Sequence, residues 1–167
     1  MATAKILHVG DDLCQRIPVL SRAGFTVLRS ENSIQAISDA FADGDFFSAI
    51  LFHSDLAAPA EPAIQTTRSL STAPLVLFQN PTVLCDDHDF DLVIPALTPP
   101  DIWLQNLREL VERAHELCEQ ARQLRKDCES VRSHSQALRA SAARNRAIAI
   151  DSDVLLPRDG GKTSGSE

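Results

Sequence analysis

The chain is poor in aromatic residues: one Trp, seven Phe and no Tyr make up 5% of its 167 residues. A core must therefore be aliphatic, and 44% hydrophobic residues are enough for one packed domain with an appendage. No apolar run approaches the ~20 residues that a membrane-spanning helix needs. The first residues run straight into an apolar segment and do not resemble a signal peptide. We therefore expect a cytoplasmic protein without a membrane partner.

Basic residues are scarce in the first part of the chain, where residues 1–100 hold 12 acids and 5 bases. Because phosphate contacts need clustered Lys and Arg, this balance argues against a nucleic-acid partner. An adaptor that binds nucleic acid through arginines of the later segment remains an alternative. The four cysteines form no C-x-x-C pair and no zinc spacing, so we interpret them as reduced thiols.

Short apolar runs alternate with helical patterns over the first hundred residues. The expected strands are 4–9, 25–29, 48–52, 75–78 and 92–94, and the expected helices between them are 13–23, 33–42 and 61–71. Such alternation predicts an α/β fold, with a parallel sheet covered by helices on both faces.

A different pattern follows Pro100, because no Gly or Pro interrupts residues 101–150. Apolar or small residues recur there at alternating spacings of three and four, which predicts a long helix with a coiled-coil seam. We predict a homodimer through this seam, in an orientation that the sequence leaves open. The expected organisation is a domain over 1–115, a coiled-coil helix over 116–148 and a flexible tail over 149–167. The seam residues expected to carry dimerisation are Leu110, Leu117, Leu124, Cys128, Val131 and Leu138.

Two carboxylates, Asp11 and Asp12, directly follow the first predicted strand. They should lie at the carboxyl edge of the sheet, where ligands bind in open α/β folds. Paired carboxylates suit Mg²⁺, which prefers oxygen ligands. The alternative is that Asp12 caps the next helix, and no other cofactor is expected.

This pattern resembles a response-regulator receiver domain over roughly residues 4–115. The resemblance implies a flavodoxin-like (βα)₅ doubly wound sheet, with strand order 2-1-3-4-5, and a role in two-component signalling through protein partners. The family's site has an acid pair after strand 1, a phosphoaccepting Asp after strand 3, a Thr or Ser after strand 4 and Lys-Pro after strand 5. The acid pair matches Asp11 and Asp12.

The remaining site positions depart from the family. Strand register places His53 at the phosphoacceptor position, whereas the D-x-x-x-P pattern selects Asp55. The Thr/Ser position falls on Gln79, the Lys position falls on Ile94, and Pro95 is retained. An ammonium group pairs with the phosphoryl group in the family, which Ile94 cannot do. We therefore predict a pseudo-receiver that is not phosphorylated and is not an enzyme.

Two further alternatives stay open beside the nucleic-acid adaptor. The first is a functional receiver phosphorylated on Asp55 with Mg²⁺. The second is a metal-dependent enzyme that uses Asp11, Asp12 and His53. His53 itself has three interpretations: a hydrogen-bonded residue in a vacated site, a proton-linked switch or a metal ligand. Residues 85–91 form a dense run of possible ligands, which we interpret as a solvated loop.

Overall fold

The computed structural model describes residues 4–12, 14–42, 44–53, 61–79, 89–95 and 97–154, with side chains up to residue 146. The chain divides into two units, residues 1–119 and 120–167, each considered by itself below. This division falls four residues beyond the domain boundary that the sequence predicts.

The described strands form one five-stranded parallel sheet in the order β2-β1-β3-β4-β5. This order confirms the flavodoxin-like fold predicted from the sequence. Each strand lies within two residues of its expected position. β1, β3 and β4 are buried along most of their length, as expected for apolar strands covered on both faces, whereas the edge strand β2 is mostly exposed. The strands are β1 Lys5–Val9, β2 Thr26–Ser30, β3 Ala49–His53, β4 Leu75–Gln79 and β5 Leu92–Pro95.

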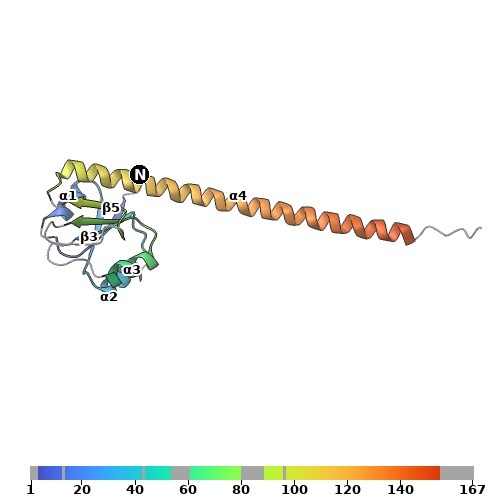
Figure 1. The fold of residues 1–167 in the computed structure, drawn as a ribbon, viewed down its shortest axis with the longest axis horizontal. Helices are drawn as coiled ribbons and strands as arrows, with labels where there is room; N and C mark the ends of the chain where they lie inside the picture. Colours follow the sequence, from blue (N-terminus) through green and yellow to red (C-terminus); the bar gives the residue numbers. More distant parts are fainter. Residues whose placement is uncertain are drawn as a thin grey trace, which may run out of the picture. The chain divides into compact units, whose positions relative to one another are not determined.

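Within the described ranges, four helices accompany the sheet, with α2 and α3 on one face and α1 and the beginning of α4 on the other (Figure 1). α1 begins three residues later than the range expected from the sequence, and Pro18 lies in its first turn, where a proline is tolerated. The Ser33 hydroxyl caps α2 by accepting the Ala36 N–H at 3.2 Å. The helices are α1 Arg16–Arg22, α2 Ile34–Ala42, α3 Glu61–Leu70 and α4 Pro100–Val154.

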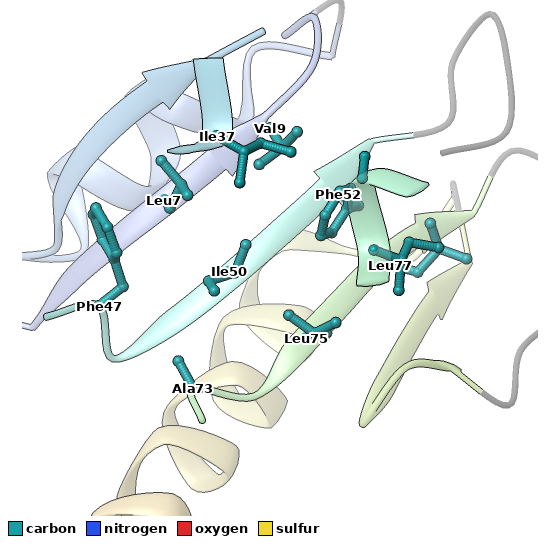
Figure 2. Close-up of a cluster of buried hydrophobic side chains, with 11 residues drawn as sticks. Leu7, Val9, Ile37, Phe47, Ile50, Phe52, Ala73, Leu75 and Leu77 are labelled. Carbon is teal, nitrogen blue, oxygen red and sulfur yellow. The ribbon is translucent and has the colours of Figure 1, made fainter. Parts of the chain in front are cut away.

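A largely aliphatic core, with Phe47 and Phe52, fills the face under α2 and α3 (Figure 2). Leu7, Ile50 and Leu75 come from three neighbouring strands and are fully buried there. Ile37 enters from α2, and its burial fixes that helix against the sheet. Alternate strand residues therefore point to this face, which leaves the other residues of each strand for the opposite core.

The second core lies under α1 and the first turns of α4. Trp103 packs edge-to-face on Phe78, with ring centroids 5.3 Å apart. Leu107 and Ile94 are buried beside them. The chain's single Trp thus anchors α4 to the sheet, and an aromatic pair of this kind adds about 1 kcal/mol beyond its buried area.

Beyond these first turns, the seam residues predicted on α4 are exposed in the single chain. Leu110 is half-buried against the core of its own domain, so it differs from the later seam residues. The helix also continues through Val154, past the predicted end at residue 148, because the next helix-breaking Pro comes only at Pro157. The uncovered seam residues are Leu117, Leu124, Val131 and Leu138, which expose 58%, 64%, 66% and 59% of their surface.

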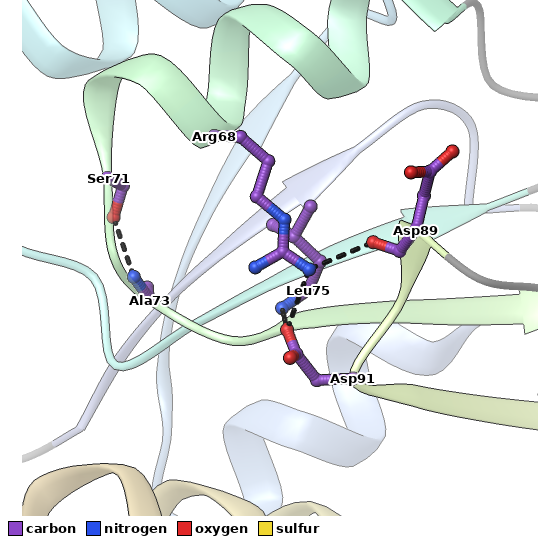
Figure 3. A network of polar contacts seen from close by, with 6 residues as sticks. All are labelled: Arg68, Ser71, Ala73, Leu75, Asp89 and Asp91. Atoms are coloured by element: carbon purple, nitrogen blue, oxygen red, sulfur yellow. Dashed lines mark hydrogen bonds and ion pairs between the residues drawn. The ribbon is translucent and has the colours of Figure 1, made fainter. Parts of the chain in front are cut away.

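A polar network joins α3 to the start of β4 and to the residues that precede β5 (Figure 3). The Asp91 carboxylate accepts the backbone N–H of Leu75 at 2.7 Å and pairs with Arg68 at 3.1 Å. Arg68 also donates to the backbone carbonyl of Asp89 at 2.9 Å. Asp91 therefore has a structural role at the end of the ligand-rich run, whose residues 85–88 lie outside the described part of the chain.

Candidate functional site at the carboxyl edge of the sheet

Strand register brings most of the predicted site positions to one edge. His53 ends β3 and lies opposite Phe78, while Gln79 lies opposite Pro95. Asp11 follows β1, the other neighbour of β3. Asp55 lies outside the described residues, so its place in the site stays a prediction.

His53 is held between two partners and is only 6% exposed. Its Nδ1 lies 2.5 Å from the backbone carbonyl oxygen of Asp11, and its Nε2 contacts a guanidinium nitrogen of Arg16. A carbonyl only accepts and a guanidinium only donates, so the ring is neutral and carries its proton on Nδ1. This geometry favours the interpretation of His53 as a hydrogen-bonded residue that fills the site.

Arg16 is the site residue that the sequence analysis missed. It is 6% exposed, and its guanidinium carbon lies 3.9 Å from the centre of the Phe78 ring. It opens α1 directly after Gln15, whose positive φ of 51° turns the chain into the helix. A buried Arg is uncommon, and no pattern in the sequence marked this one. The site therefore contains a cation from α1, where the sequence analysis found only the lost lysine of β5.

A second histidine lies beside this pair inside the sheet. His8 is fully buried, and its ring centroid lies 5.8 Å from that of His53. Neither of its ring nitrogens has a hydrogen-bond partner within the described part of the chain. Burial lowers the pKa of His8 from 6.5 to about 4, outweighing the opposing effect of the Asp12 carboxylate. His8 is therefore neutral at neutral pH.

The two acidic residues have separate partners. Asp12 accepts the backbone N–H groups of Arg16 and Ile17 at 2.6 and 3.1 Å, one with each carboxylate oxygen. Asp11 pairs with Arg29 at 3.0 Å. This geometry favours the capping interpretation of Asp12. Among the described residues no three His, Cys, Asp or Glu gather as metal ligands, so an Mg²⁺ site at Asp11 and Asp12 stays a prediction.

An open pocket of about 550 Å³ lies beside β1 and β2, outside the His53 cluster. Arg29 and Asp11, which line it, already neutralise each other. Glu31 adds a second acid against this single base, so the lining does not favour an anionic ligand. The full lining is Gly10, Asp11, Arg29, Ser30, Glu31 and Asn32.

Ile94, at the position of the family's lysine, lies in the core. Ile94 is 2% exposed and packs in the cluster that contains Trp103 and Leu107. Pro95 follows it at the end of β5, and Gln79 is half-buried at the end of β4. An aliphatic side chain at this place supplies no charge to the edge of the sheet.

No protein-family model matches the sequence, and no curated protein matches it. Solved structures do match. An adenylate cyclase from Rhodopirellula baltica aligns with a TM-score of 0.60 and 14% identity, over 74% of this chain and 98% of the other. A CheY-like response-regulator receiver domain from Methanospirillum hungatei aligns with a TM-score of 0.52 and 17% identity, over 69% and 98%. The chain has a receiver-domain fold.

A third similar structure extends the likeness into α4. A fusion that contains the trimeric coiled coil of yeast Spc42 aligns with a TM-score of 0.51 and 16% identity, over 93% of this chain and 99% of the other. At such identities the likeness establishes the receiver-domain fold, and the function has to be argued from the residues of this chain. Within the described residues, no helix combines the length and apolarity that crossing a membrane requires.

Proposed function

We propose that this chain is a degenerate receiver that acts in two-component-type signalling through protein contacts, without a phosphorylation step and without enzymatic activity. The observation that carries this proposal is the neutral His53 at the end of β3, held between Arg16 and the Asp11 carbonyl. Both ring nitrogens are engaged, so His53 offers no free nucleophile at the phosphoacceptor position.

The surroundings of His53 support the same conclusion. Asp12 is used to cap α1, and Ile94 provides no ammonium group. The metal-dependent enzyme is not favoured, because His53 and Asp12 would both have to abandon their protein partners to bind a metal.

Intact-mass measurement after treatment with acetyl phosphate and Mg²⁺ tests this proposal. We expect no added phosphoryl group on the native chain under conditions that fully label an active receiver run in parallel. A stoichiometric gain of one phosphoryl group would contradict the proposal.

An active receiver phosphorylated on Asp55 is the second candidate, and the buried guanidinium of Arg16 is the observation that favours it. A cation at this edge could pair with a phosphoryl group in place of the missing lysine. The two candidates differ in the mass experiment: a phosphoryl gain abolished by Asp55→Asn and reduced by Arg16→Met would establish the second one.

The second part of the proposal is self-association through the α4 seam. Leu117 and Leu124 leave most of their surface uncovered on a helix whose apolar residues follow a heptad pattern. Burying such a row between two helices is the main source of coiled-coil stability. The cytoplasmic setting expected from the sequence is part of this proposal.

Sedimentation velocity of Leu117→Asp/Leu124→Asp tests the seam. We expect the native chain to sediment as a dimer and the variant as a monomer with an unchanged α/β domain by circular dichroism. A matched control, Ser130→Asp/Ser133→Asp, adds the same charge to exposed positions outside the seam and should remain dimeric. A variant that stays dimeric would contradict the assignment of the seam as the dimer interface.

A further inference from the structure

The flanks of the seam differ sharply in charge. In heptad notation, the small residues at 114, 121, 128, 135 and 142 occupy the a positions, and the large residues at 117, 124, 131 and 138 occupy the d positions. One flank, position e, then consists of arginines alone between residues 125 and 146. These are Arg125, Arg132, Arg139 and Arg146, all exposed. The other flank, position g, holds Gln120, Asp127, His134 and Ser141, also exposed.

These flanks decide between the two orientations of a pair. In an antiparallel pair, e faces e of the second helix, so the arginine rows of the two copies would meet and repel. In a parallel pair, g faces e of the following heptad of the second helix. Asp127 then lies next to Arg132 of the second copy, and no arginine faces another arginine.

Neighbours on the same helix neutralise only part of the arginine row. Glu129 lies four residues after Arg125 and three residues before Arg132, close enough to interact with both. Arg139 and Arg146 have no acidic residue three or four positions away. These two arginines would therefore repel a second row of arginines without compensation from acidic residues on their own helix.

Packing of the seam alone allows both orientations. In an antiparallel pair, the small a residues of one helix would face the large d residues of the other. In a parallel pair, layers of small residues would alternate with layers of large ones. The charge pattern therefore makes the choice. We propose that two copies of this chain associate through α4 in parallel and in register, a proposal that rests on the self-association described above. The two receiver-fold domains then join the paired helices at the same end.

Cys128 provides a reporter of this arrangement. It occupies an a position and is exposed in the single chain. In a parallel, in-register pair it lies opposite its own copy, near enough for a disulfide. Cys118 occupies an e position, where two copies lie further apart across the seam.

Disulfide trapping in the full chain tests the orientation. The variant Cys14→Ser/Cys85→Ser/Cys118→Ser keeps only Cys128 and should form a covalent dimer nearly completely under mild oxidation. The matched variant Cys14→Ser/Cys85→Ser/Cys128→Ser keeps only Cys118 and should remain mostly uncrosslinked. Equal or faster crosslinking through Cys118 would overturn the parallel arrangement.

Charge reversal gives a second, cysteine-free test by sedimentation equilibrium. In a parallel pair, Arg132→Glu places a carboxylate beside Asp127 of the second copy and should weaken association by about tenfold. Adding Asp127→Arg should restore it. Lys126→Glu makes the same charge change outside the flanks and should leave association unchanged. Tighter association of Arg132→Glu would identify an antiparallel pair, because the introduced carboxylate would then approach the arginine row of the second copy.

These outcomes are separable from failure of the proposed self-association. If the native chain is a monomer, or if the Leu117 and Leu124 variant remains dimeric, the seam itself is wrong. If the seam variant dissociates but Cys128 fails to crosslink, the seam is the interface and the parallel orientation is wrong.

Discussion

Arg16 donates a hydrogen bond to Nε2 of His53, and the same guanidinium stacks on the ring of Phe78. One side chain thereby ties the start of α1 to the ends of β3 and β4. Because the imidazole must be neutral to accept this bond, the Arg16 guanidinium brings a positive charge to His53 that the ring does not share.

Removing this side chain should destabilise the domain. Arg16→Met keeps part of the aliphatic stem but leaves Nε2 of His53 buried without its donor, which should cost about 2 kcal/mol. Urea unfolding followed by circular dichroism measures the change. Arg22→Met, on the exposed last turn of the same helix, should stay within about 0.5 kcal/mol of the native chain. Equal effects of both changes would contradict the arrangement at Arg16.

His8 should make the fold sensitive to acid. Its pKa is lowered to about 4 in the folded chain and returns to 6.5 on unfolding, so the unfolded chain binds a proton first as the pH falls. Stability is therefore retained above pH 6.5 and lost between pH 6.5 and 4. The loss should reach about 2 kcal/mol at about pH 5.

Thermal unfolding at about pH 7 and about pH 5 measures this linkage. His8→Leu should lose less stability between the two pH values than the native chain does. His134→Gln, at an exposed position of α4, should behave like the native chain. A native-sized loss in His8→Leu would assign the acid sensitivity to another group.

The network of Figure 3 predicts a contrast between two neighbouring aspartates. Asp91→Ala removes the acceptor of the Leu75 N–H and the partner of Arg68, and should cost about 1–2 kcal/mol. Asp89→Ala keeps the backbone carbonyl that Arg68 uses, and should cost less than about 0.5 kcal/mol. Urea unfolding separates the two variants, and a larger loss for Asp89→Ala would contradict the network.

Placing the family's lysine at position 94 should destabilise the domain and should not restore phosphorylation. Ile94→Lys places an ammonium group among Trp103 and Leu107, and its burial should cost about 3 kcal/mol or more. Ile94→Val removes one methylene and should cost about 1 kcal/mol. The two variants are compared by urea unfolding, together with the acetyl phosphate assay. A stable Ile94→Lys protein that accepts a phosphoryl group would show that position 94 reaches the site after all.

The fold could be predicted because its signals are local. Buried runs such as 49–53 and 75–79 fit a parallel sheet, and Ser33 marked the start of α2. The end of α4 was less predictable, because no residue between 148 and 154 breaks a helix and none requires one. The sequence left open whether Asp12 caps α1 or binds a metal, because capping and metal binding use the same carboxylate oxygens.

The amino-acid sequence by itself determined the strand–helix alternation, the aliphatic core and the heptad seam of α4, since each depends on the spacing of side chains along one element. Only the tertiary structure decided that Arg16 enters the site, that His53 is neutral and that His8 has no polar partner among the described residues. These features depend on atoms that are 37 or more residues apart, or on the depth of burial, and no local pattern encodes either.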